Sequence, residues 1–169
     1  MLALPAGRRW LRRNFEGEHR GLLGLALGIA TFASVGSLYL SESVGFIPCL
    51  LCWYQRIAMY PLVPVLAVGA LLADRGAWRY GLPLSVIGLL IAAYHVLIQL
   101  RPGLDAGMCE AGVPCTARYL AIFGFISIPV MAGAAFLLIS AILLVVWTAN
   151  RDGESFDEVA PAEQPDPMG

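Results

Sequence analysis

Charged residues are scarce in this 169-residue sequence, and lysine is absent. Only 14% of the residues are charged and 59% are hydrophobic, whereas about a quarter of the residues in ordinary soluble domains are charged. This balance excludes a soluble globular domain and predicts a membrane protein. The sequence also lacks a basic stretch interleaved with aromatic residues, so we expect no nucleic-acid partner.

Charge is missing altogether from four long apolar segments. A helix needs about 20 apolar residues to cross the hydrocarbon core of a membrane. Segments of this kind occur at residues 21–40, 57–73 and 81–100 and within 119–148, and none contains Asp, Glu, Lys or Arg. The connecting segments are short, which predicts an all-α bundle of four antiparallel transmembrane helices.

The distribution of arginine predicts the orientation of this bundle. Arginines at positions 8, 9, 12, 13, 20, 75, 79 and 151 lie on one side of the four segments, and those at 56, 101 and 118 lie on the other. Because positively charged loops are retained in the cytoplasm, both termini are expected to be cytoplasmic. All four cysteines then lie on the outer side, where disulfides are permitted in bacteria.

The sequence predicts three regions. Residues 1–20 are basic and are expected to form a short amphipathic segment at the membrane surface. A cleavable signal peptide is the alternative, but the apolar run that follows is longer than the 7–15 residues typical of one. Residues 21–148 form the transmembrane domain, and residues 149–169 are acidic and Pro-rich and are expected to be disordered.

Small residues recur along the first apolar segment. Gly24 and Gly28 are four residues apart, and Ser34, Gly36 and Ser37 follow them. Such a stripe lets a second helix approach closely in a membrane. We therefore expect these residues to serve helix packing.

Two cysteines, Cys49 and Cys52, stand where the second apolar segment begins. Proline is favoured at the first position of a helix, so Pro48 marks a helix start. The helix is therefore predicted to begin beside it, at Cys49. Cys49, Cys52 and Arg56 then share one helix face. Since a helix N-terminus favours a thiolate, this pattern predicts a redox dithiol with a cation one turn below it. The alternative for Arg56 is a side chain that reaches to the lipid headgroups.

A histidine and a second cysteine pair accompany this dithiol. His95 is the only histidine within an apolar segment, at the expected depth of Cys52 and Arg56. An ionisable group inside a membrane indicates a functional site, and the alternative is a neutral histidine hydrogen-bonded between helices. Cys109 and Cys115 lie in the loop between the third and fourth segments.

The four cysteines admit three interpretations. A zinc site of four thiolates requires two short spacings, and the pair Cys49 and Cys52 meets only half of that requirement. Structural disulfides are a second possibility, although a bridge between cysteines so close in the sequence stabilises little. A redox relay needs one pair near the membrane and one on a loop, which exchange a disulfide by thiolate attack. The sequence favours the relay, and no metal site is expected.

Several ordered motifs resemble the DsbB/BdbC family of disulfide bond formation membrane proteins. These are the run Cys49-Leu50-Leu51-Cys52-Trp53-Tyr54-Gln55-Arg56, the pair Tyr94-His95, Cys109 with Pro114-Cys115, and Gly124-Phe125-Ile126-Ser127-Ile128-Pro129. The resemblance covers residues 20–148. The second cysteine loop is short, as in the BdbC branch, which makes the order of exchange within it the least transferable feature.

The resemblance implies a quinone-dependent protein thiol-disulfide oxidoreductase in the bacterial inner (plasma) membrane. Such a protein reoxidises a DsbA-like or BdbD-like thiol oxidase outside the membrane and passes the electrons to a membrane quinone, either ubiquinone or menaquinone. The resemblance assigns catalysis to Cys49, Cys52, Cys109 and Cys115, and quinone binding to Cys52, Arg56 and His95.

This assignment predicts an order of thiol exchange. The reduced partner attacks Cys109, the released Cys115 attacks Cys49, and Cys52 leaves as a thiolate near Arg56. Two alternatives stay open. One is a quinone-linked thiol reductase of the vitamin K epoxide reductase type, which uses the same parts in the reverse direction, and the other is a non-enzymatic membrane protein stapled by disulfides.

Overall fold

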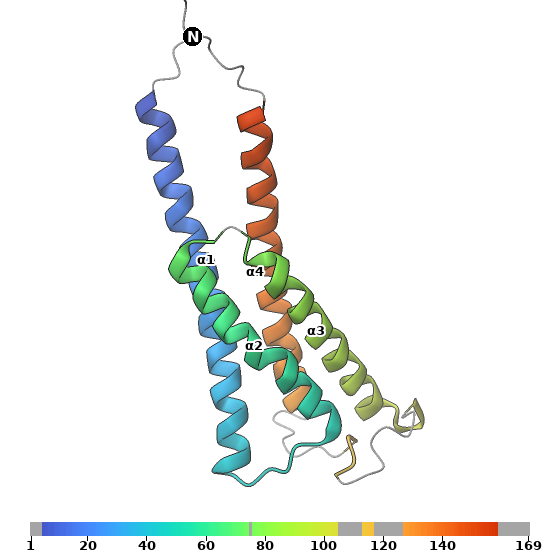
Figure 1. Ribbon diagram of the computed structural model, residues 1–169. Helices are drawn as coiled ribbons and strands as arrows, with labels where there is room; N and C mark the ends of the chain where they lie inside the picture. Colours follow the sequence, from blue (N-terminus) through green and yellow to red (C-terminus); the bar gives the residue numbers. More distant parts are fainter. Residues whose placement is uncertain (1–4, 75, 105–112, 117–126, 159–169) are drawn as a thin grey trace, which may run out of the picture.

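The computed structural model describes residues 5–74, 76–104, 113–116 and 127–158, with side chains described between residues 19 and 150. These ranges contain α1 (Pro5–Glu42), α2 (Leu50–Leu72), α3 (Trp78–Leu100), the 3-10 turn η1 (Pro102–Leu104) and α4 (Ile128–Glu158). Figure 1 shows the four α-helices gathered in one bundle, with the beginning of α1 and the end of α4 at the same end.

Each of the four helices contains a segment long and apolar enough to cross a membrane. Within the described residues these segments are His19–Glu42, Leu50–Leu72, Trp78–Leu100 and Ile128–Asn150. Large apolar side chains on the outside of the bundle are exposed, as at Phe32, which is 80% exposed. Helices satisfy their own backbone hydrogen bonds, as the lipid interior requires. The predicted all-α, four-span fold is confirmed, and the side on which the termini lie stays a prediction.

The first and last helices extend further than the predicted spans. α1 begins at Pro5, within the basic segment, and α4 continues to Glu158. The last helix thus includes residues 149–158, where the sequence predicted a disordered tail. An existing helix adds a backbone hydrogen bond with each further residue at little extra cost, which favours this extension. Residues 159–169 lie outside the described residues, and the division into three regions stays a prediction.

α3 and α4 pack closely through a glycine and an aromatic ring. A Cβ atom added at Gly88 of α3 would lie 2.2 Å from Cε1 of Phe136 on α4, whose side chain is fully buried. Nearby, the Ser140 hydroxyl donates a hydrogen bond of 2.9 Å to Ser85 Oγ across the same interface. The absence of a side chain at Gly88 is therefore what admits the ring of Phe136.

Three glycines of α1 do not have the packing role expected of them. A Cβ atom added at Gly24, Gly28 or Gly36 would meet no atom within 4 Å. All three glycines instead line an open groove bordered by α1, α2 and α4. Small residues in a helix leave room that either a second helix or an open groove can occupy, and here they border a groove.

The tightly packed Gly88 and the groove-lining Gly28 predict different effects of an alanine substitution on stability. Gly88→Ala forces the Phe136 ring to move and should lower the free energy of unfolding by about 1–3 kcal/mol, the usual cost of overpacking. Gly28→Ala, the matched control, meets open space and should leave stability unchanged or slightly raised. Thermal unfolding of both variants in detergent measures the difference, and equal midpoints would contradict the packing described here.

Candidate thiol-disulfide site

Cys49 is the N-cap residue of α2. Its backbone is extended (φ −70°, ψ 170°), and its sulfur accepts a hydrogen bond of 3.4 Å from the backbone N–H of Cys52. The first helical residue is Leu50, so Pro48 precedes the cap and does not occupy the first helical position predicted for it. The free N–H groups of a helix start need acceptors, and here a cysteine sulfur supplies one.

Cys49 and Cys52 are free thiols whose sulfur atoms share a hydrogen bond at 2.9 Å. Cys49 is 5% exposed, whereas Cys52 is half-buried. The hydrogen bond to Cys52, and next the one to His95, lower the pKa of Cys49 below that of an ordinary thiol, although burial opposes them. The structure thus directs an N–H group of the helix start to the Cys49 sulfur.

His95, on α3, connects three segments of the chain. Its Nε2 lies 3.0 Å from the carbonyl oxygen of Cys115 and 3.7 Å from Cys49 Sγ, and its Nδ1 lies 3.4 Å from Gln55 Nε2. A carbonyl oxygen only accepts, so Nε2 carries the proton and Nδ1 accepts from Gln55. The buried ring therefore lies between the α2 dithiol and the second cysteine loop.

Cys115 belongs to the same apolar cluster as Cys49. It is 1% exposed and disulfide-bonded, and Leu51 and Ile98 complete the buried part of the cluster. The structure thus brings Cys115 to the N-terminus of α2, in the way that an exchange between the two cysteine pairs requires. Cys109 lies outside the described residues, and its role stays a prediction.

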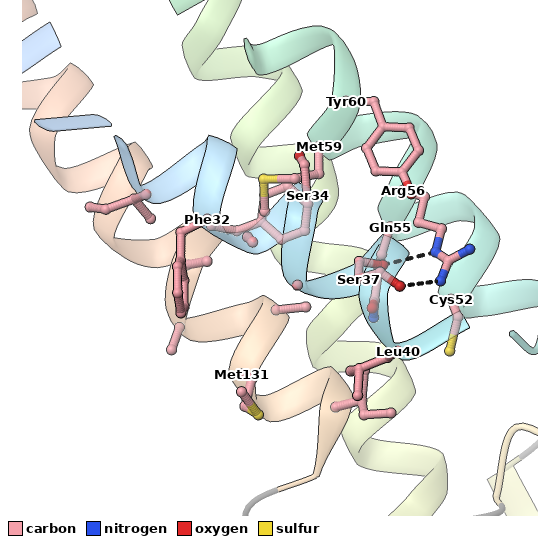
Figure 2. A pocket seen from close by; sticks show the side chains of 18 of the residues that line it. Phe32, Ser34, Ser37, Leu40, Cys52, Gln55, Arg56, Met59, Tyr60 and Met131 are labelled. Atoms are coloured by element: carbon pink, nitrogen blue, oxygen red, sulfur yellow. Dashed lines mark hydrogen bonds between the residues drawn. The ribbon is translucent and has the colours of Figure 1, made fainter. Parts of the chain in front are cut away.

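Arg56 is bound to α1. Its Nε donates a hydrogen bond of 2.9 Å to Ser37 Oγ, and its Nη2 donates one of 2.8 Å to the Ser37 carbonyl and another to Ser41 Oγ. The guanidinium also lies 5.3 Å from the ring centre of Trp53. Figure 2 shows both bonds to Ser37, with Cys52 beside the arginine.

Sequence reasoning missed both serines. It assigned Ser37 to helix packing and gave Ser41 no role. Their spacing of four residues, which places both hydroxyls on one face of α1, was the available signal. The guanidinium of Arg56 is therefore hydrogen-bonded to α1 rather than free to extend to the lipid headgroups. Its expected role beside the Cys52 thiolate and a quinone stays a prediction.

An apolar groove with a volume of about 940 Å³ opens beside the dithiol. Its walls come from α1, α2 and α4, and Cys52, Gln55 and Arg56 are among the residues that line it. Ser34 and Tyr60 also line the groove, and their buried hydroxyl oxygens have no hydrogen-bond partner among the described residues. Figure 2 shows these side chains around the groove.

These features define a membrane-embedded thiol-disulfide centre beside an apolar groove. The family profile "Disulfide bond formation protein DsbB" matches residues 19–146. The chain belongs to this family, and it is a multi-pass membrane protein with a thiol-disulfide oxidoreductase role in disulfide formation.

Relatives support the same membership. The chain is 48% identical over 112 residues to disulfide bond formation protein C of Bacillus subtilis, covering 66% of this chain and 81% of the relative. It is 44% identical over 123 residues to probable disulfide formation protein C 2 of Bacillus anthracis, covering 73% and 88%. It is 47% identical over 119 residues to a probable disulfide formation protein of Oceanobacillus iheyensis, covering 69% and 82%. No solved structure matches the chain significantly.

The contact between Arg56 and α1 predicts a stability effect. In Ser37→Ala/Ser41→Ala the guanidinium loses two acceptors, and hydrogen bonds to charged groups contribute about 1.5–3 kcal/mol each. We expect a clearly lower midpoint of thermal unfolding in detergent. Ser34→Ala is the matched control on the same helix, because its hydroxyl has no partner among the described residues. If the double variant were as stable as this control, the contact would have no energetic role.

Proposed function

We propose that this protein reoxidises a DsbA-like or BdbD-like thiol oxidase outside the membrane and passes the electrons to a membrane quinone. The family supports the disulfide-forming role, and the partner and the quinone are the proposed part. The observation that carries the proposal is the position of Cys52. It contacts Cys49 on one side and lines the apolar groove on the other.

The groove has the chemistry that a quinone requires. Its walls suit a prenylated ring, and the unpartnered hydroxyls of Ser34 and Tyr60 are donors for carbonyl oxygens. Nη1 of Arg56 makes no hydrogen bond among the described residues, so it too is a donor for a ligand. A bound quinone would accept two electrons and two protons from the dithiol. Cys52 and Arg56, which line the groove, remain proposed quinone-binding residues. His95 also remains proposed, although it is not among the groove-lining residues and lies beside Cys49.

The cysteines supply the relay. The reduced partner attacks Cys109, which forms a mixed disulfide and releases Cys115 as a thiolate. Cys115 attacks Cys49 of the oxidised α2 pair, and Cys52 leaves with the electron pair. The second thiol of the partner then displaces Cys109 and releases the oxidised partner. Cys109 in turn attacks Cys115 and displaces Cys49, which re-forms the loop disulfide and leaves the α2 pair reduced. The burial of Cys115 in the cluster that contains Cys49 supports this order. The hydrogen bond that His95 makes to the Cys115 carbonyl would hold the loop beside its target.

Energetics favour a quinone as the final acceptor. DsbA-type partners have reduction potentials near −120 mV, and 30 mV corresponds to about 1.4 kcal/mol for a two-electron couple. Only a more oxidising acceptor can reoxidise them. A reductase of the vitamin K epoxide reductase type would use the same residues but pass electrons in the opposite direction, from a quinol to the protein partner.

Purified protein in detergent tests the direction. With a reduced DsbA-like protein and ubiquinone-1 or a soluble menaquinone, the loss of quinone absorbance should follow the appearance of oxidised partner in equal amounts. A stapled, non-enzymatic protein would consume no quinone. Net reduction of the oxidised partner by added quinol would favour the reductase.

Substitutions at Arg56 should separate its charge from its geometry. Arg56→Lys keeps the charge but loses the planar fork of donors, so it should retain part of the activity with a higher KM for quinone. Arg56→Met loses both, and loss of hydrogen bonds to a charged group corresponds to about 10–100-fold in kcat/KM. Arg79→Met, at the other end of the bundle, is the control and should match the parent. An unchanged KM in Arg56→Met would remove Arg56 from the quinone site.

Cys109→Ser should separate the two halves of the relay. The α2 pair is intact in this variant, so a small dithiol should still drive quinone reduction. Turnover with the protein partner should be lost, because the partner has no disulfide to attack in the loop. Both rates are measured on one preparation. Full turnover of Cys109→Ser with the protein partner would show that the proposed order of exchange is wrong.

A further inference from the structure

The reduced site holds three metal-ligating side chains together. The Sγ atoms of Cys49 and Cys52 and a ring nitrogen of His95 all lie within 4.8 Å of one another. Cys49 and His95 are buried, and Cys52 faces the groove. The sequence argued against zinc because Cys49 and Cys52 supply only half of a four-cysteine set. The fold adds His95 from α3 and makes a set of two thiols and one imidazole.

The spacing of these atoms is close to that of ligands on one tetrahedral ion. Zinc binds sulfur at about 2.3 Å and imidazole nitrogen at about 2.0–2.1 Å, so neighbouring ligand atoms lie about 3.5–3.8 Å apart. Cys49 Sγ and His95 Nε2 are already 3.7 Å apart. The two sulfur atoms, at 2.9 Å, must separate by a little under 1 Å. Cys52 can make this movement because its side chain borders open space.

Charge also favours a divalent ion. Each thiol releases a proton on binding, and two thiolates neutralise the two charges of the metal. A neutral site suits a membrane edge, where an uncompensated charge is costly. His95 can ligate through Nε2 once its proton moves to Nδ1, which faces the Gln55 amide at 3.4 Å. The amide oxygen of Gln55 can then accept that proton in a hydrogen bond, as partners of ligating histidines commonly do.

We propose that the reduced protein binds one thiophilic divalent cation of the zinc class through Cys49, Cys52 and His95, and that the bound ion blocks turnover. Binding exchanges two thiol protons for the ion and transfers no electrons. The oxidised pair cannot bind in this way, because a disulfide has no thiolates. The ion also takes the nitrogen that holds the Cys115 carbonyl, so it releases the loop contact. Binding is independent of the proposed function, and inhibition rests on it.

Cobalt(II) is the probe for binding. Full-length protein with Cys109→Ala/Cys115→Ala, which removes the other cysteine pair, is reduced, desalted without oxygen and titrated with Co²⁺ in detergent. We expect one Co²⁺ per chain, with thiolate-to-cobalt charge-transfer absorption and the visible bands of a tetrahedral site. Zn²⁺ should displace it. The same protein with a Cys49–Cys52 disulfide should bind none, and equal binding in both states would overturn the proposal.

Histidine variants test the third ligand. Loss of an outer-shell partner costs about 10–100-fold in metal affinity, so His95→Ala, which removes a direct ligand, should weaken binding by at least about 100-fold. His19→Ala removes the only other histidine, outside the cluster, and should bind like the parent. His95→Cys should restore tight binding with stronger charge-transfer absorption. If His95→Ala bound as tightly as the parent, or His95→Cys as weakly as His95→Ala, the assignment of His95 would be wrong.

Inhibition is measured separately, with the natural chain, a small dithiol and quinone. Zn²⁺ at a concentration that saturates the site should stop quinone reduction, and a chelator should restore it. Continued turnover with zinc bound would overturn the inhibitory role of the ion. It would not affect the proposal that the site binds the ion. If metal-free protein reduced no quinone, the proposed function would fail, while the cobalt titration would still decide the metal site.

Discussion

Lipid offers no hydrogen bonds, so a charged or strongly polar group inside this bundle is stabilised chiefly by partners within the protein. That constraint arranges the end of the bundle at which α2 begins. Arg56 donates hydrogen bonds to two serines of α1, and His95 is hydrogen-bonded to Gln55 and to the Cys115 carbonyl. Each of these contacts joins segments that are far apart in the sequence. The polar residues that fit redox chemistry are thus also the residues that hold the helix ends together.

His95 has a central place in this arrangement. Its two nitrogens face different segments, and the tautomer is set by the Cys115 carbonyl, which only accepts hydrogen bonds. The position of the loop, the orientation of the Gln55 amide and the surroundings of the Cys49 sulfur therefore depend on one imidazole ring.

The sequence predicted the four spans because length and apolarity alone determine whether a helix crosses a membrane. It also placed Cys49 and Cys52 at a helix start, within one residue of the observed cap. It did not predict the bonds of Arg56 to α1, because a serine in a membrane helix serves packing and hydrogen bonding equally well. It likewise took Gly28 for a packing residue, since glycine borders grooves and tight contacts alike. Both features depend on which helices become neighbours.

The cap on α2 has a consequence for the energetics of electron transfer. The Cys49 sulfur accepts the Cys52 N–H while the pair is reduced, and a disulfide sulfur is a weaker acceptor than the sulfur of a reduced cysteine. A side-chain oxygen cap contributes about 1 kcal/mol, which for two electrons corresponds to about 20 mV, and this is the upper bound for a sulfur cap that only weakens on oxidation. The start of the helix thus favours the reduced pair and raises its midpoint potential. A backbone amide in the first turn of α2 therefore acts as part of the redox couple.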